Sequence, residues 1–198
     1  MKRIDCLREL HRLRQGELVV TQMGATATEW LVLTEDEEES FYLKSAMGMV
    51  SSFGLGLALA LPDRAVWAFD GDGSFVMNLG SLLTLAENQP PNLKHFVFSN
   101  RCYESTGDQP IVNAARTDYV ALANGAGIKN AYTFDDVGAF QREIGAIVRR
   151  DEYAMVILET ELGGDQYDLY PADPIEQTYK FGRQLERTQG ISIFKYQP

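Results

Sequence analysis

The segment 64–102 constrains the fold more than any other part of the chain. An apolar run at residues 65–69 ends in DGDGS, and a helical pattern follows at about residues 78–87. After a Pro-Pro break, a second apolar run at residues 96–98 ends in Ser-Asn. This order predicts one βαβ unit with two parallel strands. Polar groups then follow both strands at one edge of the sheet, where open parallel sheets bind ligands.

The residues after the first run suit a metal ion and a diphosphate. Asp72 supplies a carboxylate and Asn100 an amide oxygen, and both suit Mg²⁺, which is usually shared with phosphates. Gly71 and Gly73 allow close approach of the backbone to a phosphate, and Ser74 can donate a hydrogen bond to it. Asp-Gly is also a common hairpin turn. The helix and the second strand that follow favour the diphosphate–metal site instead.

The rest of the chain alternates predicted helices and strands. Helices are expected at residues 2–14, 47–61, 117–124 and 135–150, and strands at residues 18–22, 41–43, 129–132 and 154–158. This order, with apolar strands, predicts an α/β fold built on a doubly wound, mostly parallel sheet with helices on both faces. We expect residues 1–162 to form this domain and 163–198 to be a C-terminal arm packed on the domain or on a partner. The acidic run 35–39 is expected to be a solvated loop.

Length and composition narrow the classes of protein. A chain of 198 residues with 45% hydrophobic content suffices for one packed domain but not for two. The net charge of −10 argues against nucleic acid or an anionic membrane as a partner. Neither a signal peptide nor an apolar run of the roughly 20 residues that span a membrane is evident. Two distant cysteines argue against a disulfide framework or a zinc cluster. We therefore expect a soluble, cytoplasmic protein.

The motif GDGS, followed by Asn100 after a helix and a strand, resembles the thiamine-diphosphate motif of the pyruvate-decarboxylase-like enzymes. The run GDGS-x-x-MNLGSL and the segment YESTGDQP are similar to those of sulfopyruvate and phosphonopyruvate decarboxylases, in particular the sulfopyruvate decarboxylase β subunit. The resemblance covers roughly residues 22–132. It implies the thiamine-diphosphate-binding fold of the PP type, with thiamine diphosphate and Mg²⁺ as cofactors.

The resemblance also implies a set of site residues. The metal ligands would be Asp72, Asn100 and the backbone carbonyl of Cys102. The full cofactor-binding set would be Gly24, Thr26, Ser45, Met47, Gly71, Asp72, Gly73, Ser74, Asn100, Cys102, Tyr103 and Glu104.

Met47 and Ser45 carry the implied catalytic roles. In the family, the large apolar residue at the position of Met47 holds the cofactor bent, so that its amine lies near the thiazolium carbon. The carbonyl of Ser45 would accept a hydrogen bond from that amine. Ser45 stands where the family usually has glycine, which keeps the carbonyl and adds a side chain beside the pyrimidine. By composition alone, Met47 is an ordinary core methionine.

The segment after Asn100 departs in part from the family. Arg101 replaces a small residue, often glycine, and its cation either pairs with an anionic substrate or faces solvent. The polar loop 103–109 is expected to cover the diphosphate and the substrate, with Ser105, Thr106 and Gln109 as further contacts. Cys102 is not expected to be a nucleophile, because no histidine base is near in sequence.

Thiamine catalysis also needs a carboxylic acid that protonates the pyrimidine ring. In the family, this acid is a glutamate on a separate pyrimidine-binding domain, and this chain is long enough for only one of the two domains. The resemblance therefore implies the diphosphate-binding subunit of a two-subunit 2-oxoacid decarboxylase for a small anionic 2-oxo acid. It would be active only with a pyrimidine-binding α-type subunit, in a hetero-oligomer of dimers.

Other functions stay open at this point. The chain could be a subunit of a carboligase or synthase, or a non-catalytic cofactor-binding regulatory subunit. An oxoacid:ferredoxin oxidoreductase is disfavoured, because the chain has only two cysteines and no cluster motif.

Overall fold

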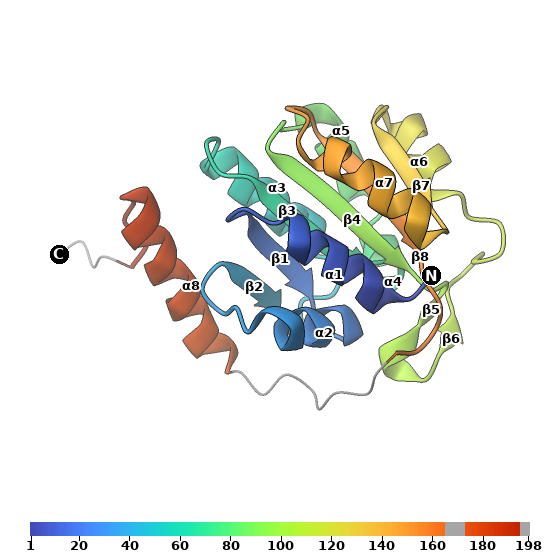
Figure 1. Ribbon diagram of the computed structural model, residues 1–198, viewed down its shortest axis with the longest axis horizontal. Coiled ribbons are helices and arrows are strands. Elements are labelled where there is room, and N and C mark those ends of the chain that lie inside the picture. The colour runs from blue at the N-terminus through green and yellow to red at the C-terminus, as the bar shows by residue number, and fades with distance from the viewer. Residues whose placement is uncertain (165–172, 195–198) are drawn as a thin grey trace.

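The computed structural model describes residues 1–164 and 173–194. At its centre is a sheet of six parallel strands in the order β2-β1-β3-β4-β8-β7 (Figure 1). The strands are β1 Leu18–Gln22, β2 Ser40–Leu43, β3 Val66–Gly71, β4 Leu93–Ser99, β7 Ala131–Phe134 and β8 Ala154–Glu159. The inner strands β3 and β4 are buried along their whole length, as expected of strands covered on both faces. The predicted doubly wound, parallel sheet is confirmed.

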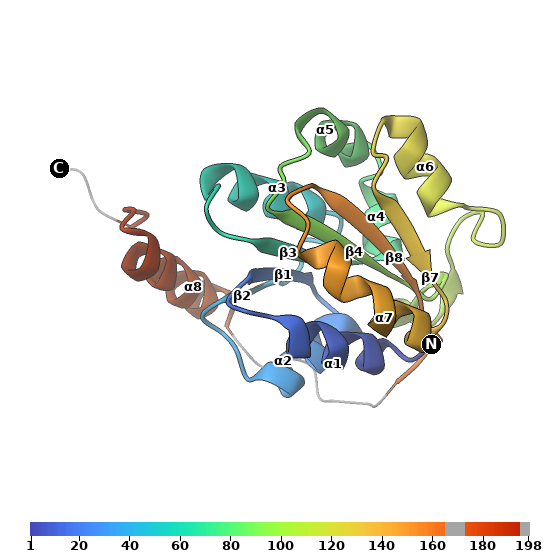
Figure 2. The same cartoon turned by 45° about the horizontal axis from the view of Figure 1, so that its top comes forward.

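Helices cover both faces of the sheet (Figure 2). On one face lie α1 Arg3–Leu13, α2 Ala25–Thr34 and α7 Val137–Val148. On the other lie α3 Val50–Ala60, α4 Asp72–Met77, α5 Ser81–Asn88 and α6 Tyr119–Ala126. The first face is rich in rings, and Trp30 of α2 meets Phe69 of β3 edge to face at 5.0 Å. In the part of the chain that the structure describes, no helix combines the length and apolar character needed to cross a bilayer.

The strand order places a topological switch point between β1 and β3. From β1 the chain passes through α2 to β2 on one side, whereas β3 pairs with β1 on its other side and leads on to β4. The segments that follow β1 and β3 therefore diverge, and a crevice opens at the carboxyl ends of these strands. The residues at that edge are Gln22 and Gly71, the last residues of the two strands.

Two helices on the domain differ from the sequence prediction. Residues 72–77 form α4, which begins directly after β3 with no separate turn. Residues 25–34 form α2, a segment in which no helix was predicted. A glycine precedes each helix, Gly24 before α2 and Gly71 before α4, and glycine on local propensity favours a turn over a helix.

A further helix, α8 Pro174–Gln189, lies in the segment that was predicted to be a C-terminal arm. The Asp173 side chain accepts hydrogen bonds from two N–H groups of its first turn, and Gly190 ends it in the left-handed conformation. Its buried residues include Phe181 and Leu185, spaced to lie on one stripe. The Phe181 ring packs at 5.1 Å from that of Phe41 in β2, so α8 covers this edge of the sheet (Figure 1).

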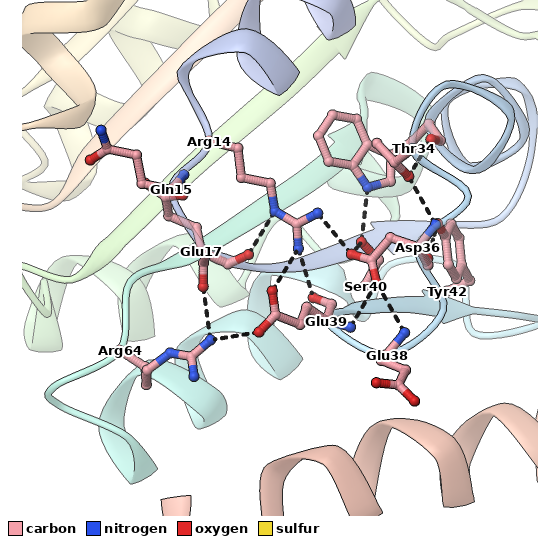
Figure 3. A network of polar contacts seen from close by, with 12 residues as sticks. Arg14, Gln15, Glu17, Thr34, Asp36, Glu38, Glu39, Ser40, Tyr42 and Arg64 are labelled. Carbon is pink, nitrogen blue, oxygen red and sulfur yellow. Dashed lines mark hydrogen bonds and ion pairs between the residues drawn. The ribbon is translucent and has the colours of Figure 1, made fainter. Parts of the chain in front are cut away.

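The acidic run 35–39 is not the freely solvated loop that its charge predicted. Asp36 accepts hydrogen bonds from Arg14, from Ser40 and from two backbone N–H groups (Figure 3). Although burial opposes the shift, the Glu39 N–H and the Arg14 guanidinium lower the pKa of Asp36 below its usual range. Glu39 pairs with Arg64 at 3.4 Å. The run therefore joins the end of α1 to the start of β2.

Candidate active site

A pocket lies at the switch point, at the carboxyl ends of β1, β3 and β4. It is lined by Arg3, Gln22, Met23, Gly24, Ala25, Thr26, Met47, Gly71, Asp72, Gly73, Ser74, Phe98, Asn100, Cys102, Tyr103, Glu104, Ser105 and Thr106. Every residue of the predicted cofactor-binding set except Ser45 is in this lining. Ser45 is exposed on the loop before α3 and has a φ of 62°. The lining residues come from five separate parts of the sequence, which the fold brings together.

Asp72 is the buried acid of the pocket, with 2% of its surface exposed. Its Oδ1 accepts the N–H of Gly73 at 2.9 Å, and its Oδ2 accepts the Arg101 N–H at 2.6 Å and the Ser99 hydroxyl at 3.1 Å. Burial raises the pKa of Asp72 to about 6, and these hydrogen bonds oppose the shift only in part. A carboxylate held in such surroundings is stabilised in its ionised form by a bound cation.

Asn100 and Glu104 form the second polar group of the pocket. The Asn100 Oδ1 accepts the N–H of Cys102 at 3.1 Å, and its Nδ2 donates to the Oε2 of Glu104 at 2.8 Å. The predicted loop 103–109 folds here as β5 Cys102–Tyr103, a 3₁₀ turn η1 Glu104–Thr106 and β6 Gln109–Pro110. Since β5 and β6 pair, the loop has a defined shape over the pocket.

The first turn of α2 forms part of the wall of the pocket. Gly24 precedes this helix with a φ of 103°, and no side chain caps the first N–H groups. Gly24, Ala25 and Thr26 all line the pocket. Because unpaired N–H groups at a helix N-terminus attract anions, this wall suits a phosphate. A Cβ at Gly24 would lie 3.0 Å from the Ser105 hydroxyl, so the covering loop rests on this turn.

Glycines line the floor of the pocket where side chains would block it. A Cβ on Gly73 would lie 2.7 Å from the Tyr103 ring and 3.3 Å from the Met47 methyl group. A Cβ on Gly71 would collide with the Gln22 amide. The Ser74 hydroxyl accepts the N–H of Gly48 at 2.9 Å, which leaves its own hydrogen free to donate.

Met47 stands at the mouth of this pocket. It is 37% exposed, so it is not the core methionine that composition alone predicted. The Gly48 carbonyl accepts a hydrogen bond from Asn78 at 3.0 Å, and the Gly48 N–H binds Ser74. These two bonds fix the loop that carries Met47 to the segment around α4.

The Arg101 side chain is 34% exposed and is held by groups of the chain itself. Its guanidinium forms an ion pair with Glu159, donates to the carbonyls of Ala114 and Thr117, and lies 4.8 Å from the centre of the Tyr119 ring. Its donors are therefore used within the chain. Its φ of 65° lies in the left-handed region, which favours glycine, the residue that the family resemblance led us to expect here.

Sequence reasoning missed two polar residues of the site. Gln22 is the last residue of β1 and lines the pocket, and its place at the end of a predicted strand was a usable signal. Arg3 reaches the pocket from α1, and its side chain is only 4% exposed. No local pattern could have identified Arg3, because its partners Glu29 and Glu104 are distant in sequence.

The oxygen ligands in this pocket suit a divalent cation that is also bound by a diphosphate. They are too few for a metal ion held by protein side chains alone. Among residues 1–164 and 173–194, no three His, Cys, Asp or Glu side chains are grouped to hold a metal. A metal here would use one carboxylate, one amide and backbone oxygens, and would take further oxygens from a ligand, as Mg²⁺ commonly does.

Comparison with known proteins agrees with this geometry. Residues 26–158 match the family model of the thiamine pyrophosphate enzyme C-terminal TPP binding domain. The chain is 30% identical to sulfopyruvate decarboxylase subunit beta of Methanocaldococcus jannaschii, over 94% of this chain and 98% of the relative. It is 39% identical to the subunit of the same name from Methanothermobacter thermautotrophicus, over 69% of this chain and 72% of the relative.

Two longer proteins are also similar. Phosphonopyruvate decarboxylase of Streptomyces hygroscopicus is 40% identical over 62% of this chain, which corresponds to 30% of that protein. Among solved structures, the thiamine diphosphate-dependent 4-hydroxybenzoylformate decarboxylase of Rhodococcus jostii RHA1 superposes with a TM-score of 0.68. That alignment covers 83% of this chain and 33% of the other at 17% identity, so it supports the fold alone.

Proposed function

The chain belongs to the thiamine pyrophosphate enzymes and carries their C-terminal cofactor-binding domain, and from this premise we propose that it is the diphosphate-binding subunit of a two-subunit 2-oxoacid decarboxylase. The observation that carries the proposal is the meeting of Asp72, Asn100 and the α2 N-terminus around one pocket. The chain spans 98% of a relative named as a beta subunit, which supports a role as one subunit of two.

We infer the following arrangement of the cofactor on this chain. The side chains of Asp72 and Asn100 and the carbonyl of Cys102 would hold Mg²⁺. The α2 N-terminus and the Ser74 hydroxyl would bind the diphosphate oxygens, since both offer free donors. Thiamine diphosphate, when bound, supplies the electron sink that decarboxylation of a 2-oxo acid requires.

The remaining parts of the site concern the other end of the cofactor. Met47 would support it from the mouth of the pocket, and the Ser45 carbonyl would accept a hydrogen bond from its amine. Glu104 is the only other carboxylate among the lining residues, and it is bound to Arg3 and Asn100. The acid that activates the pyrimidine is therefore assigned to the partner, a pyrimidine-binding α-type subunit.

The surface around the pocket supports such a partner. Met23 and Met47 line the pocket with 41% and 37% of their surfaces exposed, and Met77 on the nearby α4 is 60% exposed. Apolar side chains gathered at the rim of a site are typical of a surface that another chain covers.

The substrate is inferred from the relatives. Their names indicate sulfopyruvate or phosphonopyruvate, both small 2-oxo acids with an anionic tail. A carboligase role has weaker support, because the similarity to acetolactate synthase isozyme 1 of Escherichia coli covers only 22% of this chain. A non-catalytic cofactor-binding role shares all the binding features and is separated from catalysis only by turnover.

Calorimetry combined with a turnover assay tests the proposal. Thiamine diphosphate with Mg²⁺ is titrated into this chain alone and into its complex with the pyrimidine-binding subunit of the same organism. CO₂ release is then measured with sulfopyruvate and with phosphonopyruvate. We expect tight binding and turnover only in the complex. Binding without turnover of either acid would indicate a regulatory subunit, and the absence of binding would overturn the cofactor assignment.

A matched pair of variants ties the result to the site. Asp72→Ala removes the buried carboxylate and is expected to abolish cofactor binding. Asp63→Ala removes an exposed carboxylate outside the pocket and should bind the cofactor like the unmodified chain.

A further inference from the structure

Arg3 connects α2 to the loop above the pocket. Its guanidinium binds Glu29 of α2 through two hydrogen bonds of 3.1 and 2.9 Å, in a pair that is almost fully buried. A third donor, Nη1, reaches the Oε2 of Glu104 at 2.9 Å. Since Glu29 holds the guanidinium in two places, Arg3 is a fixed donor at the base of the 3₁₀ turn that carries Glu104.

Glu104, which Arg3 holds in place, in turn fixes the orientation of the Asn100 amide. The same oxygen, Oε2, accepts both from Arg3 and from the Nδ2 of Asn100 at 2.8 Å. An ionised carboxylate can only accept hydrogen bonds, so it selects the amide face of Asn100 and turns Oδ1 the other way. The Asn100 Oδ1 accepts the N–H of Cys102 at 3.1 Å, the residue whose carbonyl is the third predicted metal ligand.

We propose that Arg3 is a positioning residue for cofactor binding, which acts through Glu104 to orient the Asn100 amide oxygen toward the metal. This inference rests on the function proposed above. It assigns a role to α1, which contributes no predicted ligand. Glu104 presents one acceptor oxygen that two donors share, and it does not itself contact the metal.

The test uses the complex with the pyrimidine-binding subunit and measures the affinity for thiamine diphosphate as the Mg²⁺ concentration is varied. Glu104→Met removes the shared acceptor and leaves the Arg3–Glu29 pair intact. We expect it to raise the Mg²⁺ concentration needed for half-maximal cofactor binding about tenfold. Glu104→Gln keeps one oxygen that can accept from both donors, and should stay within about threefold of the unmodified complex.

Arg3 is tested with a matched variant on the same helix. Arg3→Met should weaken cofactor binding at least as much as Glu104→Met. Arg12→Met also removes an arginine that pairs with a glutamate, but that side chain is 66% exposed and outside the pocket, and it should leave binding unchanged. Thermal unfolding without cofactor identifies any loss of folding in Arg3→Met, in which case the Glu104 pair of variants decides.

The outcomes separate this inference from the proposed function. If the unmodified complex binds no cofactor, the proposed function fails and this inference fails with it. If the unmodified complex binds and Glu104→Met binds equally well, only the positioning role is overturned. An equal loss in the Gln and Met variants would also overturn it, because a shared acceptor oxygen predicts that glutamine restores binding.

Discussion

At Gly73 the absence of a side chain shapes the pocket directly. The nearest atoms to a Cβ built there belong to Tyr103 and Met47, which both line the pocket. Gly56 offers the contrast, because it lies within α3 and no atom lies within 4 Å of its Cβ position. A side chain added at Gly73 would therefore collide with the pocket wall, whereas one added at Gly56 would meet open space.

Gly73→Ala is expected to displace the Tyr103 ring and to weaken cofactor binding about tenfold, with a loss of about 1–3 kcal/mol in the free energy of unfolding from overpacking. Gly56→Ala should raise that free energy by about 0.5–1 kcal/mol, because alanine loses less backbone entropy in a helix. Chemical denaturation and calorimetry measure both. Cofactor binding by Gly73→Ala at the unmodified affinity would contradict the assigned packing.

Tyr153→Phe tests a buried hydroxyl for which the described residues offer no hydrogen-bond partner. Because an unpaired buried hydroxyl is costly, we expect the free energy of unfolding at pH 8 to rise by about 1 kcal/mol. Denaturant titration measures it. Tyr179→Phe, which alters an exposed tyrosine, should change it by less than about 0.5 kcal/mol. A lower stability of Tyr153→Phe would indicate that the hydroxyl is satisfied.

The same variant predicts a pH dependence. Burial raises the pKa of Tyr153 in the folded chain, whereas the unfolded chain ionises near pH 10. The stabilisation that this shift provides is complete below pH 10 and is lost as the pH rises further. Tyr153→Phe lacks this loss, so its advantage should grow by up to about 1.4 kcal/mol for each pH unit above 10. Denaturation at pH 8 and pH 10.5 compares the two proteins.

At the scale of elements, α8 is held to the sheet by apolar packing and by charge. Phe181 contacts Phe41, whose ring stacks on Phe53 at 4.8 Å. On the outside, Lys180 pairs with Glu37 at 2.7 Å. Arg187, in the last turn of the helix, pairs with Glu38 at 3.2 Å. Exposed ion pairs contribute at most about 1 kcal/mol each, so the aromatic contact should dominate.

Phe181→Ala should therefore lower the free energy of unfolding by about 3–5 kcal/mol, because it leaves a cavity between α8 and β2. Ile175→Ala, on the same helix but 68% exposed, should change it by less than about 0.5 kcal/mol. Raising the salt concentration, which screens the ion pairs, should leave α8 protected from proteolysis in the unmodified chain. Release of α8 by salt alone would show that charge holds it.

At the scale of the whole molecule, the cofactor site and the assembly are expected to be linked. We propose that the cofactor contacts both subunits, and a ligand that binds only the assembled state favours assembly by mass action. Thiamine diphosphate with Mg²⁺ should therefore tighten the association of this chain with its pyrimidine-binding subunit at least tenfold. Sedimentation velocity with and without the cofactor measures this effect.

Asp72→Ala should remove the enhancement and keep the association seen without cofactor, whereas Asp63→Ala should retain it. Association that is equally tight with and without cofactor in the unmodified chain would show that the site lies within one subunit.

The sequence by itself determined the sheet and the ends of its strands. Apolar runs of strand length predicted β1, β3, β4 and β8, and the carboxyl ends of parallel strands meet at one edge. For this reason Asp72 and Asn100 could be grouped in one site without coordinates, whereas Gly24 was added by the family resemblance. Such features depend on local pattern and on the geometry that every parallel sheet shares.

Only the tertiary structure decided the rest, because those features depend on contacts between distant segments. Arg3 meets Glu104 across 101 positions, and Arg101 meets Glu159 across 58. The acidic run pairs with Arg14, which directly follows α1, and with Lys180 of α8, and both are distant from it in sequence. A charge has the same appearance in a sequence whether it faces water or a buried partner, and the two differ only once the chain has brought that partner within hydrogen-bonding distance.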